Sequence, residues 1–515
     1  MRRRATLFLA GNSIITANFM RTSRTPSGSR VSKETMTSPR DGLHDPYWVN
    51  RFTTALFFRH ERIIEMNPEF GLRPYQAQHC AFHITHRASL NYSACATGKT
   101  YTMAWLAEYY WKTEQCKTVL INPISLSVKN KDEIVRFTDF AEDEVQIVSG
   151  TPAKRAVQWK NTKAKVFIVG PDLFGKEWEQ MLPDVKSILV DESHLAYSGH
   201  KSARTQAFYM AQKKANHITF FTATPLSSGA ASCAYPLFAV CAPRIYTNNQ
   251  RFMNYHCIKS NLGFIVGWKN LDVLGRNLKT FSVGISFAEA YKNSPGNIIS
   301  FEKCGFDDDE LQRIYSEMEE EGLAELEDHY VETPNGAVAL MKCRQLLSCP
   351  EAVGYNPKKL AKMELLRTHL QRIVDGAEKQ ILVFSCFVAA QERVVALCKE
   401  MGLSVGLING SVVGAARAQI SDDFAKGRIQ VLVASPLTMS VGHNFQNIDE
   451  LVFVDCDWSL SSFEQACFRG NRGGRSTPLP ITILVVDCKV EKRYWKKLLG
   501  EKSQYKQIVD SQLKE

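Results

Sequence analysis

The sequence contains no Cys-x-x-Cys pair and no apolar run long enough to cross a membrane. Its 14 cysteines are scattered through apolar segments, as at Cys386, Cys398 and Cys456. A disulfide scaffold would be far denser in a chain of 515 residues. These features argue against a zinc site, a disulfide-stabilised secreted protein and a membrane protein. We therefore expect reduced, mostly buried thiols in a soluble, intracellular protein.

Acidic residues are absent before Glu34, and this first segment is rich in arginine, serine and threonine. The composition predicts a disordered basic leader over residues 1–45. An organelle transit peptide has a similar composition, and the short apolar run at residues 5–10 faintly resembles a secretory signal. Translation that starts at Met36 is a further alternative.

The rest of the composition is ordinary for a globular protein, with 44% hydrophobic and 23% charged residues. The length fits two or three domains. The formal net charge of +10 is compatible with a polyanionic partner such as a nucleic acid, but also with none.

A polar loop of small residues, Ser93 to Thr100, ends in Gly98-Lys99-Thr100 and leads into good helix formers. This is the second half of a phosphate-binding loop, in which backbone N–H groups and a helix N-terminus surround phosphates. Lys99 would reach the β- and γ-phosphates, and the Thr100 hydroxyl would hold Mg²⁺. The match is incomplete, because Ser93 stands where the full pattern has glycine.

Upstream of this loop, Arg73-Pro74-Tyr75-Gln76 predicts a turn that enters a helix, with Pro74 at an early helical position. The side-chain amide of Gln76 could hydrogen-bond an adenine edge, because an amide both donates and accepts.

After the loop, short apolar runs alternate with polar or helical stretches, which is typical of buried parallel strands. Ligands bind at the carboxyl ends of such strands. Asp191 and Glu192 follow one run, and we assign Asp191 to Mg²⁺ and Glu192 to the attacking water. The hydroxyls of Thr222 and Thr224 follow another run and are candidate partners of His194. The runs are residues 118–121, 166–169, 187–190 and 218–221.

Residues 250–355 contain acidic, helix-prone stretches, and we interpret them as a helical insertion between two α/β lobes. A second alternating segment follows and predicts a second lobe without a phosphate-binding loop. Its predicted strands are residues 381–384, 405–408, 431–434, 451–454 and 481–486. The expected divisions of the chain are 1–45, 46–249, 250–355, 356–490 and, as a basic C-terminal helix or tail, 491–515.

The stretch from Gln465 to Arg475 carries Arg469, Arg472 and Arg475 with three glycines between them. Spacings of three would put the arginines on one helical face. Clustered guanidinium groups repel one another unless an anion lies among them, and a γ-phosphate held by the first lobe is such an anion. A generic basic patch is the alternative.

Taken in order, these motifs resemble those of superfamily 2 helicases, and most closely the Swi/Snf-type DNA-dependent ATPases, including compact versions seen in phages. The resemblance covers roughly residues 70–490. The family pattern Gln-x-x-x-Arg-x-x-Arg-x-Gly-Arg is met in full from Gln465 to Arg475, and Arg344 to Pro350 looks like a landmark of the Swi/Snf branch. Other similar stretches begin at Arg73, Asn122, Gly170, Asp191, Thr222, Phe384, Asn409 and Ser435.

The resemblance implies two RecA-like parallel-sheet lobes in tandem, with ATP and Mg²⁺ bound between them. Catalytic roles fall on Lys99, Asp191, Glu192, Arg472 and Arg475, the last two as arginine fingers. ATP binding falls on Arg73, Gln76, Ala96, Thr97, Gly98, Lys99, Thr100, Gly442, Asn444, Arg472 and Arg475, and Mg²⁺ on Thr100 and Asp191. Coupling of ATP hydrolysis to translocation is assigned to His194, Thr222, Thr224, Gln465 and Arg469. Contact with nucleic acid is assigned to Pro123, Ser125, Gly170, Pro171, Asp172, Ser385, Gly410 and Ser435.

Two residues depart from the family pattern. Ala96 replaces the glycine that many helicases have two residues before Gly98, which puts phosphate affinity or turnover in doubt because a methyl group restricts φ. Arg475 stands where many Swi/Snf members have glutamine. We expect an ATP-dependent motor on duplex or branched DNA, without sequence preference. The alternatives are a strand-separating DNA or RNA helicase and an ATP-gated nucleic-acid-binding protein that hydrolyses ATP weakly.

Overall fold

The computed structural model describes residues 71–498, except residues 182, 198, 226–233, 261–264, 326–329, 333–335, 413, 437, 439–444, 446, 458 and 472–474. The predicted leader lies outside the described residues. So do the predicted ATP-binding residues Gly442 and Asn444, and the predicted arginine finger Arg472. No described helix is long and apolar enough to cross a membrane.

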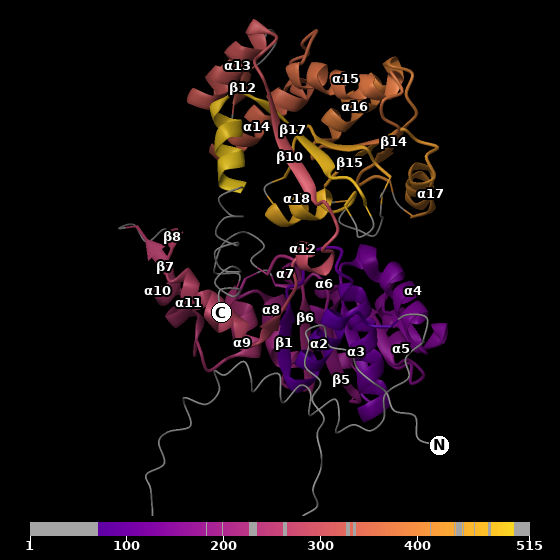
Figure 1. Cartoon of the computed structure of the whole chain (residues 1–515). Coiled ribbons are helices and arrows are strands. Elements are labelled where there is room, and N and C mark those ends of the chain that lie inside the picture. Colours follow the sequence, from indigo (N-terminus) through magenta and orange to yellow (C-terminus); the bar gives the residue numbers. More distant parts are fainter. Residues whose placement is uncertain are drawn as a thin grey trace, which may run out of the picture. The chain divides into compact units, whose positions relative to one another are not determined.

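The first sheet has seven parallel strands in the order β3-β4-β2-β5-β6-β1-β9, drawn in indigo to magenta in Figure 1. Four of its strands are those expected from apolar runs, whereas β1, β3 and β9 are additional. The strands are β1 (Ala88–Asn91), β2 (Lys117–Ile121), β3 (Val145–Ile147), β4 (Val166–Val169), β5 (Val185–Val190), β6 (His217–Phe221) and β9 (Ser282–Val283).

The second sheet has six parallel strands in the order β10-β17-β16-β13-β15-β14, drawn in red to yellow in Figure 1. All five strands expected for this half of the chain are present, and β10 joins them at one edge. The strands are β10 (Asn297–Cys304), β13 (Ile381–Phe384), β14 (Val405–Ile408), β15 (Val431–Ala434), β16 (Glu450–Phe453) and β17 (Leu479–Val486). The prediction of two parallel-sheet lobes in tandem is therefore confirmed.

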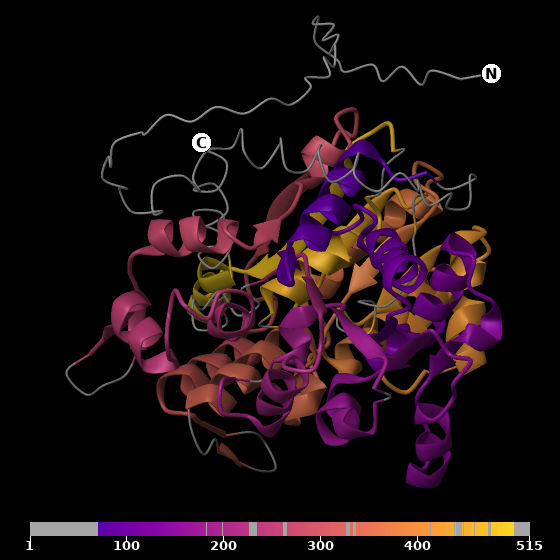
Figure 2. The same cartoon turned by 90° about the horizontal axis from the view of Figure 1, so that it is seen from below.

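Helices occupy most connections between consecutive parallel strands, and the ribbons can be followed from a second direction in Figure 2. In the first half they are α2 (Pro74–Thr85), α3 (Lys99–Glu114), α4 (Ser127–Phe137), α5 (Pro152–Trp159), α6 (Pro171–Glu177), α7 (Ser193–Ala196), α8 (Ala203–Ala211), α9 (Tyr235–Cys241), α10 (Asn249–His256), α11 (Leu271–Lys279) and α12 (Phe287–Ala290). In the second half they are α13 (Asp309–Glu320), α14 (Gly336–Ser348), α15 (Ala361–Val374), α16 (Val388–Glu400), α17 (Gly414–Ala425) and α18 (Leu460–Cys467). Residues 489–498 are also helical.

Both faces of each sheet are buried, because alternate residues of a strand enter different cores. In β2, Val119 and Ile121 belong to one core, whereas Leu120 joins Met103 and Leu106 of α3 in another. The second sheet repeats this arrangement, with Ile381 and Val383 of β13 on one side and Leu382 and Phe384 on the other. Strands covered on both faces read as continuous apolar runs, which explains why the sequence revealed them.

The structure divides the expected insertion at residues 250–355 between the two sheets. Phe252, Leu274 and Phe281 lie in a core of the first sheet, and β9 pairs with β1. Leu311 and Leu346 lie in a core of the second sheet. The expected helical insertion contains α10 to α14, and the interval also contains β7 (Cys257–Lys259) with β8 (Ile265–Trp268), β9, β10, and β11 (Leu323–Glu325) with β12 (Tyr330–Glu332).

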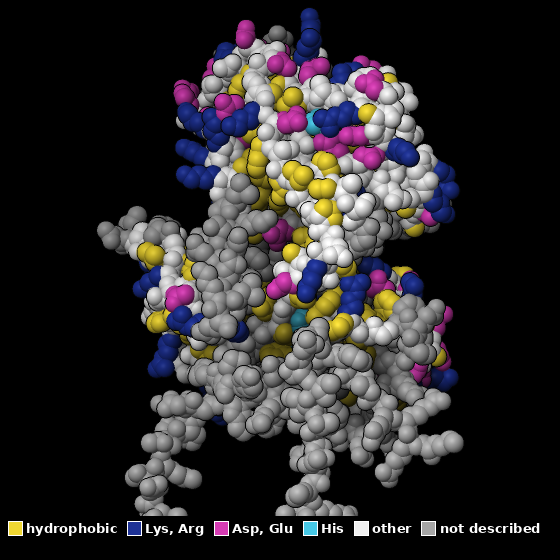
Figure 3. Space-filling model, viewed as in Figure 1, with side chains coloured by type: hydrophobic (Ala, Val, Ile, Leu, Met, Phe, Trp, Pro, Cys, Tyr) yellow, Lys and Arg dark blue, Asp and Glu magenta, His cyan; other side chains and the backbone are white. Residues whose placement is uncertain are grey.

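The edge strand β10 pairs with β17 over its whole length, from Asn297–Leu479 to Cys304–Val486. It exposes Ile298, Ile299 and Phe301, of which Ile298 is 58% accessible. Hydrophobic side chains gather along this strand on the face in Figure 3, among charges of both signs. The mixed exposure of β10 explains why its apolar residues did not indicate a buried strand.

Candidate active site

The phosphate-binding loop joins β1 to α3, which begins at Lys99. The first N–H groups of a helix have no partner within it and therefore suit an anion. The start of the loop is fixed because the backbone N–H of Ser93 donates to Asn91 Oδ1 at 3.1 Å. The loop thus places helix N–H groups, Lys99 and Thr100 at the carboxyl end of a buried strand.

Two loop residues have left-handed backbone conformations. Gly98 has a φ of 81°, and a Cβ placed there would lie 2.6 Å from Gln76 Nε2. Both the conformation and the space therefore require glycine at this position. Ala96 also has a positive φ, of 66°. The glycine of the family pattern is thus replaced by alanine at a position where the backbone favours glycine.

The carbonyl groups of this loop are held from outside by side chains. Tyr75 donates its hydroxyl to Thr97 O at 2.8 Å, and Gln76 Nε2 donates to Gly98 O at 3.2 Å. The Oε1 atom of Gln76 accepts from the backbone N–H of Arg73 at 2.9 Å. Lys99 Nζ donates to the carbonyls of Ser93 and Ala94 at 2.9 and 3.1 Å. The bonds from Tyr75 and Gln76 fix the carbonyls at the end of the loop, and those from Lys99 fix the carbonyls at its start.

Asp191 and Glu192 follow β5, as expected. Asp191 is buried, and its carboxylate accepts from Asn130 Nδ2 at 3.2 Å and from the Glu192 backbone N–H at 3.0 Å. Burial and the charge of Glu192 raise the pKa of Asp191 to about 6. Burial also raises the pKa of Glu192, against the positive charges of Lys99 and Arg469. Two neighbouring buried carboxyl groups with raised pKa values favour a cation beside them.

The carboxylate oxygen Glu192 Oε2 is buried without a hydrogen-bond partner among the described residues, although it lies 3.4 Å from His194 Nδ1. Oxygen ligands of this kind suit Mg²⁺, which is usually held by one or two carboxylates together with substrate phosphates. Within the described residues, no group of three or more His, Cys, Asp or Glu side chains could hold a metal ion alone. The residues present therefore fit a metal ion that arrives with a nucleotide.

His194 stands at the centre of a hydrogen-bonded chain that links the two sheets. Its Nδ1 lies 2.9 Å from Thr222 Oγ1, and its Nε2 lies 3.1 Å from Ser461 Oγ on α18. Thr224 donates its hydroxyl to the same Ser461 oxygen at 3.0 Å, and Gln465 Nε2 is 3.5 Å from it. Burial lowers the pKa of His194 to about 4, so the ring is neutral near pH 7.

The bond from Thr224 to Ser461 favours one tautomer of His194. Because Thr224 donates to Ser461 Oγ, the Ser461 hydroxyl is free to donate to Nε2. Nδ1 then carries the proton and donates to Thr222 Oγ1, which also accepts from the Thr224 backbone N–H at 3.0 Å. Four of the five predicted coupling residues, His194, Thr222, Thr224 and Gln465, are therefore brought together, and Ser461 is a direct partner of His194, Thr224 and Gln465.

Residues of both sheets line one cavity of about 230 Å³. Gly98, Lys99 and Thr100 meet Asp191 and Glu192 there, and α18 and the residues after it contribute Gln465, Phe468 and Arg469. Arg469 lies close enough to Glu192 to stabilise the charged carboxylate. The remaining described lining residues are Cys95, Ala96, Tyr101, Leu126, Lys129, Asn130, Glu133 and Phe137.

The two described arginines of this stretch, Arg469 and Arg475, do not share a helical face. Helix α18 ends at Cys467, before all three of them. The turn that follows is close-packed, since a Cβ at Gly470 would lie 2.4 Å from the Ile448 side chain. Arg475 donates to Ile448 O at 2.8 Å and to Thr477 O at 3.0 Å, and it is not among the described residues that line the cavity. The expectation of one helical face is corrected for these two arginines, because the helix ends before Arg469.

The residues expected to contact nucleic acid are placed unevenly. Pro123 precedes the short 3₁₀ turn Ile124–Leu126, which contains Ser125, and Gly170 and Pro171 lead into α6. Asp172 forms an ion pair with Arg204 at 2.8 Å. Gly410 has open space around it, and Ser435 N donates to Ile408 O at 3.3 Å. The Ser385 side chain is fully buried and donates to Asp455 Oδ2 at 2.7 Å, so its hydroxyl is not at the surface.

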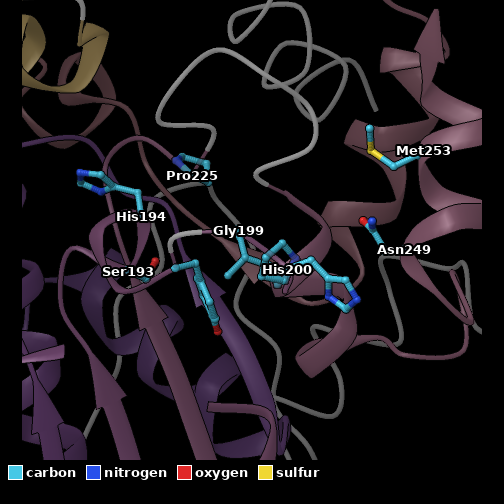
Figure 4. Close-up of a pocket in the computed structure, with 10 residues that line it drawn as sticks. Ser193, His194, Gly199, His200, Pro225, Asn249 and Met253 are labelled. Atoms are coloured by element: carbon cyan, nitrogen blue, oxygen red, sulfur yellow. The ribbon is translucent and has the colours of Figure 1, made fainter. Parts of the chain in front are cut away.

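A second cavity of about 210 Å³ lies beside α7 and α10. Figure 4 shows Gly199, His200, Pro225, Asn249 and Met253 around it, with the His194 ring turned away from Met253. The ring direction agrees with the bonds of His194 to Thr222 and Ser461. His194 therefore lines this cavity, while its ring nitrogens contact residues of the inter-sheet chain.

Sequence reasoning missed three residues of the site. Asn130 holds Asp191, Ser461 joins the coupling residues, and Tyr291 donates its hydroxyl to Ala96 O at 2.8 Å. Ser461 lies one helical turn before Gln465, which is a signal that spacing could have supplied. Asn130 and Tyr291 are separated from their partners by 61 and 195 residues and stand in no motif.

Two family models match the two halves of the chain. Residues 69–227 match the type III restriction enzyme res subunit, and residues 361–474 match the helicase conserved C-terminal domain. Among solved structures, the chain is similar to the Hef helicase domain of Pyrococcus furiosus, with a TM-score of 0.50 and 17% identity over 82% of this chain and 97% of that one. This likeness supports the fold of two RecA-like lobes.

Curated relatives are similar over most or part of the chain. It is 23% identical over 444 residues to SWI/SNF-related matrix-associated actin-dependent regulator of chromatin subfamily A-like protein 1 of Xenopus laevis, which covers 82% of this chain and 43% of the relative. It is 27% identical over 155 residues to DNA repair and recombination protein RDH54 of Saccharomyces cerevisiae, covering 30% and 17% of the two chains. The chain thus spans less than half the length of these relatives. The paired domain matches and the SWI/SNF-related relatives support the expected resemblance to superfamily 2 helicases of the Swi/Snf type.

Proposed function

We propose that this protein is a DNA-dependent ATPase that moves along DNA by closing and opening its two lobes. One observation carries the proposal: a single cavity is lined by Lys99, Asp191 and Glu192 of the first lobe and by Gln465 and Arg469 of the second. A nucleotide in this cavity would contact both lobes at once. Its hydrolysis would then alter how they are held together, which is the requirement for a motor.

The proposed chemistry assigns a role to each side of the cavity. The loop N–H groups and Lys99 bind the β- and γ-phosphates, while Glu192 orients a water for attack on the γ-phosphate. Bound Mg²⁺, held by Thr100 and Asp191 with the phosphates, would neutralise charge that develops on the phosphate oxygens. Arg469 supplies positive charge from the second lobe. Such arginines are worth roughly 10³–10⁵ in rate in other phosphoryl-transfer enzymes.

The arginine fingers remain a proposal for Arg472 and Arg475. Arg475 would have to leave the carbonyls of Ile448 and Thr477 before it could reach a phosphate. Arg469 already lies near Glu192, so we add it to the proposed set. On the other side of the loop, Arg73 and Gln76 are the proposed adenine contacts, with the Gln76 amide held by the loop backbone.

We propose DNA as the polymer along which the protein moves, because of the names of its relatives. Their names refer to chromatin and to DNA repair and recombination. The loops expected to contact nucleic acid offer hydroxyl and backbone groups suited to phosphates, which carry no sequence information. We therefore expect binding without sequence preference and weakening of affinity as salt is raised.

The test is ATP hydrolysis measured without nucleic acid and with single-stranded DNA, duplex DNA, branched DNA and RNA. We expect the largest stimulation by duplex or branched DNA. Lys99→Ala should abolish turnover and leave the far-UV circular dichroism unchanged, whereas Lys399→Ala, on the exposed end of α16, should leave turnover unchanged. Normal hydrolysis by Lys99→Ala would contradict the assignment of the site.

Further measurements distinguish the proposed motor from two other functions. A strand-separating helicase would displace a labelled strand from a partial duplex, whereas a duplex translocase would not. The left-handed conformation of Ala96 favours a second candidate, a nucleotide-gated DNA-binding protein with weak hydrolysis. That candidate predicts that ATP changes DNA affinity while DNA leaves turnover unchanged.

A further inference from the structure

The phosphate-binding loop receives a hydrogen bond from the segment that connects the two sheets. Tyr291 follows α12, and its hydroxyl donates to Ala96 O at 2.8 Å. On the other side of the loop, Tyr75 of α2 makes the equivalent bond to Thr97 O. Two consecutive loop carbonyls are therefore each held by a tyrosine hydroxyl from outside the loop.

Ala96 is the residue in this loop that most needs such support. Its φ of 66° lies in the left-handed region, which a residue with a Cβ adopts only at a cost in free energy. Gly98 also has a positive φ, but glycine adopts it without this cost. A hydrogen bond to Ala96 O fixes the orientation of the following peptide and so opposes relaxation of the alanine to a negative φ.

Tyr291 is itself held in place. The guanidinium carbon of Arg73 lies 4.8 Å from its ring centroid, and the Phe287 ring lies 4.9 Å away. Phe287 packs in turn against Phe468 of the second lobe at 5.2 Å, beside Arg469. A residue that positions another must have its own side chain fixed by packing, and Tyr291 meets this condition.

We propose that Tyr291 is a positioning residue for the nucleotide site, which holds Ala96 in the left-handed conformation that the phosphate-binding loop requires. The hydroxyl of Tyr291 thereby compensates for the absence of glycine at position 96. This inference rests on the proposed ATPase function. It assigns to the connecting segment a role in shaping the phosphate site that no sequence motif indicated.

A double-mutant cycle tests the compensation. Nucleotide affinity is measured with a fluorescent ADP analogue for the unmodified chain, Tyr291→Phe, Ala96→Gly and the double variant, together with DNA-stimulated turnover. Loss of one hydrogen bond predicts that Tyr291→Phe weakens affinity roughly two- to tenfold. With glycine at position 96 the backbone strain is gone, so Tyr291→Phe in that background should change affinity less than about twofold.

The matched control is Tyr355→Phe, which removes a hydroxyl that donates to Asp308 Oδ1 at 2.7 Å in the second lobe. It should leave affinity and turnover unchanged. If Tyr291→Phe has the same effect with alanine and with glycine at position 96, or none, the inference is overturned while the ATPase proposal stands. If the unmodified chain neither binds the analogue nor hydrolyses ATP, both are overturned.

Discussion

Single atoms decide what the phosphate-binding loop tolerates. Gly98 and Ala96 both have positive φ, but their carbonyls have different partners, Gln76 for Gly98 and Tyr291 for Ala96. At position 98 a Cβ would collide with the Gln76 amide, whereas at position 96 a Cβ is already present. The two positions therefore differ in available space rather than in backbone conformation.

Substitution of Gly98 by alanine should impair the nucleotide site more than the strain of its left-handed backbone conformation alone would. The added Cβ would lie 2.6 Å from Gln76 Nε2 and displace the amide that holds the loop. Gly402→Ala is the matched control, because Gly402 has a φ of 74° and no atom within 4 Å of its Cβ position. Both variants should lose about 1–2 kcal/mol of folding stability from strain. Nucleotide affinity, measured by titration, should fall in Gly98→Ala only.

The site was predictable from sequence where a residue belongs to a local pattern. Gly98 and Lys99 were found because they stand together in a phosphate-binding pattern, and Asp191 was found because it directly follows an apolar run typical of a strand. Tyr291 and Asn130 were not, since their roles depend on contacts that form only after the sheets assemble. The prediction for Arg469 and Arg475 failed in another way, because equal spacing suggested a helix, whereas α18 ends at Cys467.

At the scale of elements, the helix after β17 is attached to the second sheet by a buried ion pair. Lys362 of α15 is fully buried, and its ammonium donates to Glu491 and to Val454 O. Glu491 also accepts from the Val486 backbone N–H at 2.6 Å. The pair therefore joins α15, the end of β16 and the residues that follow β17.

Removal of the lysine should leave a buried carboxylate without its counter-charge. Lys362→Met is expected to cost about 3–5 kcal/mol of stability, the usual penalty for breaking a buried pair. The double variant Lys362→Met with Glu491→Gln should recover much of this loss, because glutamine keeps an acceptor for Val486 without a charge. Urea unfolding followed by circular dichroism measures both. Equal destabilisation of the single and double variants would contradict the explanation.

A second buried group attaches the edge strand β10. His369 of α15 lies 2.9 Å from Glu450 Oε2 of β16 and 3.0 Å from Glu302 Oε2 of β10, and Arg372 lies 3.2 Å from the same Glu450 oxygen. Burial disfavours the charged ring, but hydrogen bonds to Glu450 and Glu302 outweigh it and raise the pKa of His369. A ring with a carboxylate at each nitrogen is held as the imidazolium.

This arrangement predicts that stability declines as pH rises above about 6.5, the unfolded value for histidine. A histidine whose pKa is raised by folding stabilises the protein fully below its unfolded pKa. This stabilisation is lost as the pH rises through the folded-state pKa. The pKa of Glu450 is lowered overall, because burial raises it but the interaction with His369 outweighs burial. This carboxylate therefore acts oppositely, and its contribution to stability is lost in acid. His369→Gln should flatten the alkaline decline in unfolding free energy. His217→Gln, which removes a pair with Glu114 in the first lobe, should retain it.

At the scale of the whole molecule, the hydroxyl of Ser461 in the second lobe contacts the coupling residues His194 and Thr224 of the first lobe. Ser461→Ala would remove bonds to His194 and Thr224, at about 1 kcal/mol each. We expect DNA-stimulated turnover to fall roughly tenfold with little change in nucleotide affinity. Ser316→Ala on α13, whose hydroxyl donates to Gln312 O, is the control. A proportionate loss of nucleotide affinity would show that Ser461 shapes the binding site instead.

The order of strands in the second sheet has a consequence for synthesis on the ribosome. Every strand of the first sheet has been made once Val283 has emerged, whereas β10 must await β17, which begins 175 residues after Cys304 (479 minus 304). At about 5–20 residues per second, this delay is roughly 10–35 seconds. During it the nascent chain carries Ile298, Ile299 and Phe301 on a strand without its neighbour, which makes this segment the natural place for a chaperone to act.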